Sequence, residues 1–328
     1  MNPKILIVLM VIIILGTGGF LVWKNIFQPN IEKSVDELRK ASTENMVLIP
    51  AGAFAMGRKD REGWSPMADP QQFNDELPPH EVYVDAFYID KYETTNRQFK
   101  EFVDATGYVT EAERNGGASE VMVPANQAGT PIQGTDIGWK WMEGANWRAP
   151  EGPGSNIEER MDHPVVHISW NDANAYAEWV GKRLPTEAEW EKAARGGTET
   201  NWFWSDELDG SGKYANIYGE HRLDYQYPEG VFDGFSGTAP VGSLKPNQYG
   251  LYDTAGNVFE WTADWYQYDY FSSSPRENPK GPATGTEKVI KGGGWDFCEC
   301  YIRPANRQLG DLADRNHGLG FRLALDAE

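Results

Sequence analysis

The sequence predicts an α+β domain with low regular secondary structure, carried on one N-terminal transmembrane helix. Three observations predict this class. The 328 residues include 35 glycines and 13 tryptophans, a composition typical of a loop-rich fold with aromatic packing. Short strand-like runs are interspersed with helices that have recognisable caps. Finally, the chain begins with a long, almost wholly apolar run.

The N-terminal run, residues 5–23, reads ILIVLMVIIILGTGGFLVW. A helix of about 19 residues rises ~1.5 Å per residue and spans ~28 Å, close to the hydrocarbon core of a membrane. A cleaved signal peptide is the alternative, but its apolar stretch is normally shorter and followed by small residues. The bulky end of this run favours a signal anchor. We expect an anchor over 1–24, a linker over 25–44 with a polar helix at 31–41, and one domain over 45–328.

Composition narrows the partners of this domain. The formal net charge of −19 repels phosphate backbones, so nucleic acid is not an expected partner. Acidic, oxygen-rich loops suit calcium, although excess carboxylate also simply keeps a domain soluble. Only two cysteines occur, Cys298 and Cys300, and they cannot build a disulfide framework.

The domain divides into recognisable elements. Strands are expected at 46–50 and 80–89, where apolar residues cluster or alternate. Three helices have start and stop signals: Thr94 or Thr95 to Gly107, Ser169 to Gly181, and Thr186 to Gly196. The stretch 116–154 is polar and predicted to be an irregular loop, which at that length is usually functional or mobile.

Two oxygen-rich segments are candidate calcium loops. In GLYDTAGNVFEW (250–261), carboxylates lie seven residues apart around glycines that let the backbone turn its carbonyls inward. Calcium takes six to eight such oxygens, but acid-flanked glycine turns are also common structural turns. Residues 216–217 and 233–235 form a second oxygen-rich pair of segments, for which ordinary turns are again the alternative.

The remaining metal-ligating residues give a weaker pattern. His163 and His167 lie on a strand-like segment, where four residues span ~13 Å, too far for one metal ion. The segment 291–301, KGGGWDFCECY, places two thiols in a glycine-rich loop. Thiolates select soft metals such as Cu(I), although free cysteines are more often simply buried.

At these residues the chain resembles the formylglycine-generating enzyme, or sulfatase-modifying factor, family. The resemblance extends from Met46 to Leu325. It rests on ordered segments that include MVLIPAGAFAMG, TGYVTEAE, GANWRAPEGPGSNI, DHPVVHISWNDANAYAEWVGKRLPTEAEWEKAARGG, NQYGLYDTAGNVFEW, KGGGW and LGFRLA. It implies a single domain of the family's own fold, a variant of the C-type-lectin-like class, which lies outside the cytoplasm.

The resemblance also implies two structural calcium sites. The family's first site matches Asn216, Ile217, Asp233 and Phe235, and its second matches Asp253, Gly256, Val258 and Glu260. Asp253 stands where many family members have asparagine, and both residues offer an oxygen.

The implied activity is oxidation of a cysteine in the C-x-P-x-R segment of an exported sulfatase to formylglycine, with O2 and Cu(I) held by two thiolates. The candidate ligands here are Cys298 and Cys300. The family pattern, close to G-G-S-[YW]-x-C-x4-C, is altered: Gly294 replaces the serine, Phe297 stands at the first cysteine, and the loop is about three residues shorter.

The altered pattern leaves several functions open. Linear two-thiolate copper needs sulfurs ~4.5 Å apart on opposite sides of the ion. A C-x-C pair in an extended loop would put both on one face, with Cα atoms ~6.5–7 Å apart. The chain is then either a non-catalytic, calcium-stabilised binding or scaffold protein, or an active copper-dependent cysteine oxidase with a rearranged site. A different oxidation by a mononuclear metal is a third function, disfavoured by the lack of a histidine cluster.

Overall fold

The computed structural model describes residues 43–59, 70–114, 117–131, 137–217 and 231–327. The predicted anchor, nearly all of the predicted linker and its polar helix lie outside the described residues. Among the residues that are described, no helix combines the length and apolar character needed to cross a membrane. The described residues from Asn45 onward belong to one compact unit, Asn45–Glu328.

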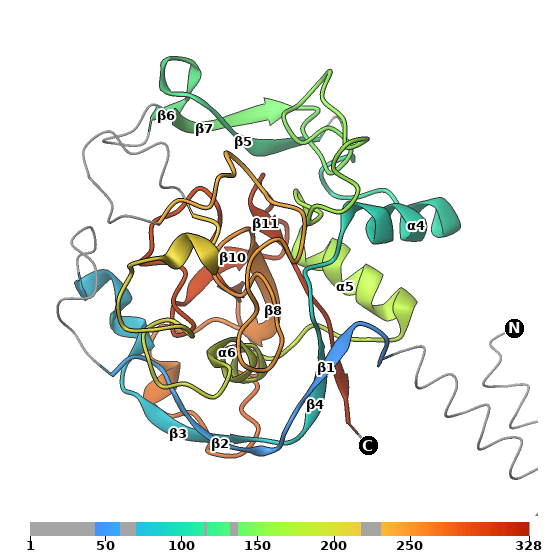
Figure 1. Ribbon diagram of the computed structural model, residues 1–328. Helices are drawn as coiled ribbons and strands as arrows, with labels where there is room; N and C mark the ends of the chain where they lie inside the picture. Colours follow the sequence, from blue (N-terminus) through green and yellow to red (C-terminus); the bar gives the residue numbers. More distant parts are fainter. Residues whose placement is uncertain (1–42, 60–69, 115–116, 132–136, 218–230, 328) are drawn as a thin grey trace, which may run out of the picture. The chain divides into compact units, whose positions relative to one another are not determined.

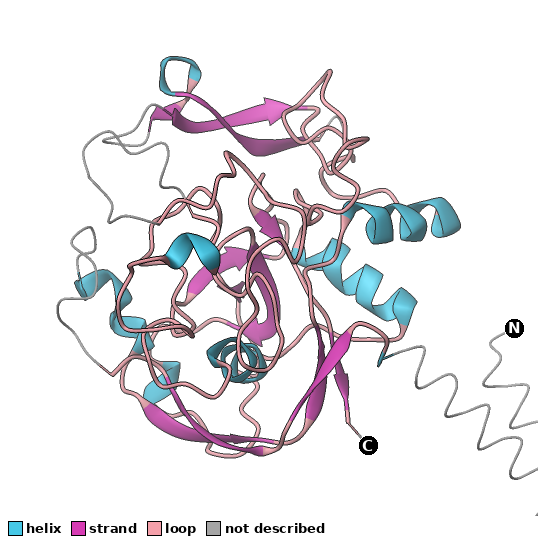
Figure 2. Cartoon of the chain, viewed as in Figure 1, coloured by secondary structure: helices cyan, strands magenta, loops and turns pink. Residues whose placement is uncertain are grey.

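Helices and strands make up only part of this unit, and long loops connect them (Figures 1 and 2). The three longer helices are α4 (Asn96–Thr106), α5 (Trp170–Val180) and α6 (Glu187–Arg195). Short 3-10 helices are η2 (Pro70–Glu76), η3 (Ala125–Gln127), η4 (Ser211–Lys213) and η6 (Tyr270–Ser272). The strands are β1 (Met46–Ile49), β2 (Gly52–Met56), β3 (His80–Val84), β4 (Phe87–Asp90), β5 (Ala118–Pro124), β6 (Thr130–Pro131), β7 (Ile137–Glu143), β8 (Phe259–Trp265), β9 (Glu287–Lys291), β10 (Gln308–Asp311), β11 (Leu319–Gly320) and β12 (Ala324–Asp326).

The described strands form four small sheets, with orders β1-β4-β12, β10-β9-β8-β11, β2-β3 and β5-β7-β6. All pairs are antiparallel except β11 with β8, whose register places Gly320 opposite Glu260. β8 pairs with β9 through a register shift between Trp261 and Trp265. This β8–β9 hairpin positions the site, because β8 follows the predicted second calcium loop and β9 leads into the cysteine loop.

The three predicted helices are confirmed, and their caps explain their ends. The side chains of Thr95, Ser169 and Thr186 each accept a hydrogen bond from the backbone N–H three residues later. The side chain at that later position in turn accepts a hydrogen bond from the backbone N–H of the cap residue. These capping boxes satisfy backbone donors that the first helical turn leaves unpaired. Each helix ends at a glycine in the left-handed conformation, the residue type that adopts it without steric penalty.

Two strand predictions need correction. The predicted strand 80–89 is two strands, β3 and β4, because the chain turns at Asp85–Ala86 and the halves join different sheets. The stretch 116–154 is not simply an irregular loop, since β5 and β7 pair in continuous register from Ala118–Glu143 to Pro124–Ile137. Polarity obscured this sheet, because only one face of it, with Ser119 and Val121, is buried.

A large cluster of buried residues in the core is rich in aromatic side chains. Phe99, Tyr176 and Phe321 pack together between α4, α5 and the C-terminal segment. Helix α6 lies among the sheets and loops in Figure 1, and all nine of its residues are buried. Its charged residues are paired inside, as in the Glu191–Arg195 ion pair.

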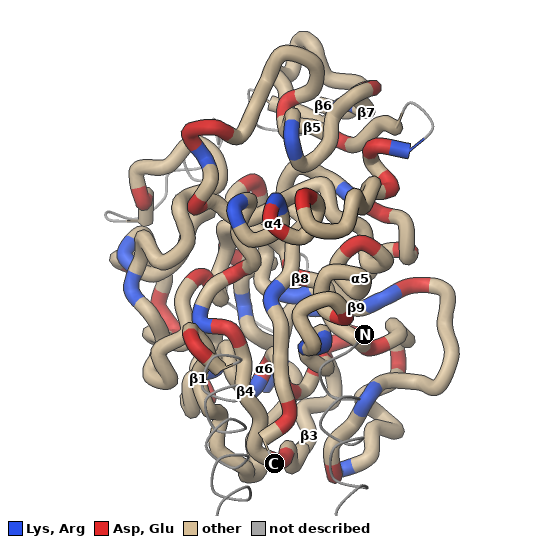
Figure 3. Tube along the Cα trace, turned by 90° about the vertical axis from the view of Figure 1, so that its right-hand side faces the viewer, with Lys and Arg blue, Asp and Glu red and all other residues tan. Residues whose placement is uncertain are grey.

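Figure 3 shows that acidic and basic residues are interspersed along the visible chain rather than separated onto different faces.

Candidate functional site

The cysteine loop begins where β9 ends, at a run of three glycines. Gly292 and Gly293 have φ angles of +96° and +74°, in the region that favours glycine. A Cβ atom on Gly293 would lie 2.6 Å from the Ile302 side chain. The glycines therefore let the chain turn sharply against the segment that follows the loop.

Cys298 and Cys300 are joined to each other by a disulfide bond. Their Cα atoms are 5.3 Å apart, closer than the ~6.5–7 Å expected for an extended loop, and that expectation was wrong. The loop turns instead of extending, since the Tyr301 N–H donates to the Cys298 carbonyl at 3.0 Å. Cys300 is 2% exposed and packs on Phe73, whereas Cys298 is partly exposed. In this joined form the sulfurs do not provide the two thiolates that Cu(I) requires.

Phe297 occupies the position that the resemblance gives to the family's first cysteine. Its ring contacts three other aromatic rings, with centroid distances of 4.8 Å to Phe259, 4.9 Å to Tyr301 and 5.8 Å to Trp139. An aromatic cluster therefore stands where a metal ligand is expected.

The glycine that replaces the family serine is matched by a nearby acid. A Cβ atom on Gly294 would lie 2.7 Å from Asp296 Oδ1, and Asp296 is 5% exposed. The other carboxylate oxygen, Oδ2, is 2.9 Å from His317 Nε2. Burial alone would lower the pKa of His317, but attraction from the Asp296 carboxylate outweighs this effect, so the pKa of His317 is raised. The pair was not among the sequence candidates, because the two residues are 21 positions apart and no motif links them.

The predicted first calcium loop contains an unsatisfied oxygen. Asn216 is 1% exposed, and its Nδ2 donates to the Gly237 carbonyl at 2.9 Å. Its Oδ1 is buried and has no hydrogen-bond partner within the described part of the chain. Nearby in sequence, Asp233 Oδ1 accepts the Phe235 N–H at 2.8 Å. A buried amide oxygen without a donor is suited to a cation, so these residues fit calcium.

The predicted second calcium loop lies beside a cluster of buried carboxylates. Glu260 accepts hydrogen bonds from Arg322 at 2.7 and 2.8 Å, and Asp253 Oδ2 accepts the Gly242 N–H at 2.7 Å. Burial raises the pKa of Asp253 to about 6. Burial also raises the pKa of Glu93, and repulsion from Asp253 and Glu260 adds to the shift. Three carboxyl groups share one guanidinium here, and a divalent cation would offset the excess negative charge.

The two predicted calcium loops are neighbours in the fold. Asn216 and Gly256 form a parallel bridge, and the Asn257 N–H donates to the Asn216 carbonyl at 3.0 Å. A Cβ atom on Gly256 would lie 1.8 Å from that carbonyl oxygen, so only glycine fits. Among described residues, no three His, Cys, Asp or Glu side chains are placed to hold a metal. The predicted sites also include Ile217, Phe235, Gly256 and Val258, whose only oxygens are backbone carbonyl oxygens.

Glu93 is a member of this region that the sequence interpretation missed. Its carboxylate accepts Asn257 Nδ2 at 2.6 Å and the Val258 N–H at 3.2 Å. It therefore supports the backbone of the predicted second calcium loop from 164 residues away. Sequence spacing carries no signal for such a contact.

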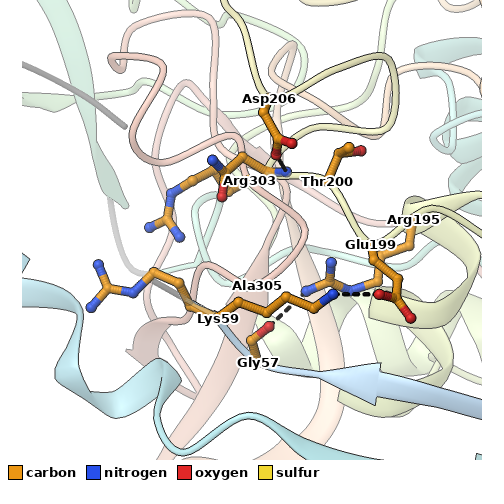
Figure 4. Close-up of a pocket in the computed structure, with 10 residues that line it drawn as sticks. Gly57, Lys59, Arg195, Glu199, Thr200, Asp206, Arg303 and Ala305 are labelled. Carbon is orange, nitrogen blue, oxygen red and sulfur yellow. Dashed lines mark hydrogen bonds and ion pairs between the residues drawn. The ribbon is translucent and has the colours of Figure 1, made fainter. Parts of the chain in front are cut away.

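Three cavities on the described surface are relevant to the site, and neither cysteine lines any of the three. The first, of about 460 Å³, is lined by charged side chains of both signs, among them Lys59, Arg195, Glu199, Asp206 and Arg303 (Figure 4). Within this lining, Lys59 forms an ion pair with Glu199. The second, of about 630 Å³, lies near Asp264 and Trp170. The third, of about 710 Å³, has Trp295 and His317 in its lining and adjoins the cysteine loop.

Comparison with known proteins agrees with the resemblance seen in the sequence. The family model described as "Sulfatase-modifying factor enzyme 1-like domain" matches residues 32–327. A formylglycine-generating enzyme from Thermomonospora curvata is 45% identical over 296 residues, which cover 86% of this chain and 94% of the relative. An inactive C-alpha-formylglycine-generating enzyme 2 from Bos taurus is 38% identical over 307 residues, covering 89% and 91%.

A solved structure shares the fold. PvdO from Pseudomonas aeruginosa superposes with a TM-score of 0.62 at 28% identity, covering 86% of this chain and 94% of PvdO. The sequence matches extend over nearly all of the described unit and include both the predicted calcium loops and the cysteine loop. The chain therefore belongs to the formylglycine-generating enzyme, or sulfatase-modifying factor, family.

Proposed function

We propose that this chain is a non-catalytic, calcium-stabilised member of its family that binds an exported polypeptide, such as a sulfatase with a C-x-P-x-R segment. The observation that carries the proposal is the altered metal loop. Phe297 packs among aromatic rings at the first cysteine position, and Asp296 Oδ1 lies 2.7 Å from the point where a Cβ atom on Gly294 would stand. The two remaining sulfurs are bonded to each other rather than open to a metal.

Calcium completes the proposal as a structural ion. The buried Asn216 Oδ1 and the excess carboxylate around Arg322 support its binding at the two predicted loops. When bound, calcium would supply charge compensation and hold the loops 216–217, 233–235 and 253–260 against one another. This role needs no redox chemistry.

We further propose that residues 1–24 anchor the protein in a membrane, that 25–44 link the anchor to the domain, and that the domain lies outside the cytoplasm. The length of the apolar run supports the anchor. Full-length protein should remain in the membrane pellet after alkaline carbonate washing and should be protease-accessible from the outer side. A version starting at residue 45 should stay in the supernatant, and full-length protein found there would contradict the anchor.

The deciding experiment is mass spectrometry of a C-x-P-x-R peptide after incubation with reduced, copper-loaded protein in air. We expect the cysteine residue to keep its mass while the peptide still binds, as measured by fluorescence anisotropy. Conversion of the cysteine to formylglycine would overturn the non-catalytic role.

One observation favours the second candidate, a copper-dependent cysteine oxidase. The sulfurs of Cys298 and Cys300 meet in the family's metal loop, so reduction would release two thiols side by side. Cu(I) bound there would supply the chemistry that activates O2. A Cys298→Ser, Cys300→Ser double variant separates the candidates, because it should lose stoichiometric Cu(I) only if these sulfurs hold the metal.

A further inference from the structure

Two stretches of consecutive residues line much of the cavity of about 710 Å³. One wall consists of the consecutive residues 121–124, at the end of β5, and another of residues 234–238. Successive side chains of a strand point to opposite faces, so a cavity that meets four consecutive strand residues lies along the edge of that strand. A volume of this size is within the range of ligand-binding pockets.

β5 is an edge strand of its sheet, whose order is β5-β7-β6. At Glu120 the outer edge is already paired: this residue bridges Asn316 in parallel, and its carbonyl accepts the His317 N–H at 3.0 Å. In an antiparallel ladder, the N–H and C=O of every second residue point to the same side. Because the pairing with β7 has no register break, Met122 also points its backbone N–H and C=O away from β7.

The outward backbone groups of Met122 have no hydrogen-bond partner in the described part of the chain. The edge stops soon afterwards, since Pro124 has no N–H and the chain enters η3 at Ala125. The N–H and C=O of Met122, a residue that lines the cavity, are therefore open directly beyond the Glu120–Asn316 bridge. An unpaired strand edge of this kind is the template to which another extended chain adds.

The other surfaces of the cavity suit a polypeptide with an apolar side chain. Val166, 5% exposed, lines the cavity together with Pro150 and the Trp295 ring. The Trp295 ring meets His317 edge-on at 5.5 Å. On the loop side, Thr238 Oγ1 is 3.0 Å from His163 Nδ1. The lining of the cavity therefore combines apolar side chains with groups that can form hydrogen bonds.

We propose that an extended segment of a partner polypeptide adds to the free edge of β5, pairs with the backbone of Met122 and places an apolar side chain against Trp295. This rests on the proposed function, because it assigns a place and a binding mode to the exported polypeptide. The segment continues the row that Asn316 and His317 begin. Specificity then comes from the pocket beside Trp295, and affinity from main-chain hydrogen bonds.

The test uses four fluorescein-labelled 12-residue peptides and the full-length protein in detergent. The first peptide has a central C-x-P-x-R segment, and the second has alternating valine and threonine without cysteine. The third and fourth are N-methylated versions of whichever of these binds better, each methylated on one of the two alternate sets of backbone nitrogens. We expect one methylated version to bind at least about tenfold more weakly and the other nearly normally, because only alternate N–H groups face β5.

Variants test the same contact from the protein side. Met122→Pro removes the outward N–H and should weaken peptide binding about tenfold, whereas Met122→Leu keeps that N–H and should not. The proline variant is expected to fold, because proline is tolerated where an edge N–H points out of the sheet. Trp295→Ala should weaken binding as well. Thermal unfolding checks that each variant folds, and the methylated peptides test the contact in unaltered protein if Met122→Pro does not fold.

The outcomes separate the two proposals. Peptide binding that ignores both the methylation pattern and Met122→Pro overturns the β5 site while leaving polypeptide binding intact. Binding of the valine–threonine probe alone, sensitive to Met122→Pro, supports the β5 site and overturns the sulfatase partner. Failure of every probe to bind overturns both.

Discussion

Asp296 Oδ1 lies 2.7 Å from the point where a Cβ atom on Gly294 would stand. A Cβ atom does not come this close to an oxygen atom unless one of them shifts, so the Asp296 carboxylate uses space that a serine at 294 would need. This carboxylate is held on its other side by His317.

The match predicts strong coupling between the two positions. Gly294→Ser should destabilise the protein by about 1–3 kcal/mol, because it overpacks a buried site. The same change in an Asp296→Ala background should be far less damaging, giving a coupling energy of roughly 1–2 kcal/mol. Urea unfolding of the four proteins measures this cycle, and additive effects would show that the side chains do not compete for space.

Arg322 is predicted to stabilise the region of the second calcium loop by compensating the charge of its carboxylates. It is fully buried and bonded to Glu260, with Glu93 and Asp253 close enough to act on its charge. Arg322→Met should leave buried carboxylates uncompensated and destabilise the protein by about 3–5 kcal/mol. As a control, Arg97→Met removes a surface ion pair with Asp162 and should cost below about 1 kcal/mol. Equal losses, measured by denaturant unfolding, would contradict the role of Arg322.

Local signals made the helices predictable. Thr95, Ser169 and Thr186 cap helices through contacts with residues three positions away, so their information is contained in a short window. The family motifs likewise identified the fold, and they marked Gly294 and Phe297 as departures. Both departures are now accompanied by specific packing around the cysteine loop.

Long-range relationships were not predictable in the same way. Glu93 reaches a loop 164 residues later, and Asp296 meets His317 across 21 residues, so neither pair leaves a periodic pattern. The Cα separation of Cys298 and Cys300 was overestimated because spacing alone does not reveal the turn in the loop. The β5–β7 sheet was missed because its exposed face reads as a polar loop, and the partner strand decides its burial.

His167 should make stability depend on pH. It is fully buried, with Nε2 2.9 Å from the Pro150 carbonyl, and burial together with repulsion from His317 lowers its pKa to about 3. The unfolded state, with a pKa of ~6.5, then binds one more proton than the folded state between these values. The stabilisation that comes from keeping His167 neutral in the folded state is complete above pH ~6.5. It is lost as pH falls toward 3, which lowers the free energy of unfolding by on the order of 4 kcal/mol in total.

A variant isolates this effect from other acid-sensitive groups. His167 has a φ of +59°, which asparagine tolerates, so His167→Asn keeps the backbone compatible. Between pH 4 and 6, the slope of the unfolding free energy should be smaller in the variant by about 1.4 kcal/mol per pH unit. Identical slopes in urea-unfolding series would mean that another group carries the pH dependence.

Calcium removal should weaken both the fold and the proposed peptide site, because Phe235 belongs to the predicted first calcium loop and also lines the cavity beside β5. A chelator should lower the unfolding temperature, since an ion that binds only the folded state at 100 times its Kd contributes about 2.7 kcal/mol.

Asn216→Leu should lower stability and abolish much of the chelator effect, because it removes the buried Oδ1. The matched change at the exposed Asn126, Asn126→Leu, should leave the chelator effect unchanged. Calorimetry with and without chelator measures these shifts, and peptide anisotropy in the same samples should fall with calcium loss. A protein whose unfolding temperature ignores the chelator has no structural calcium, and the buried Asn216 oxygen would then need another donor.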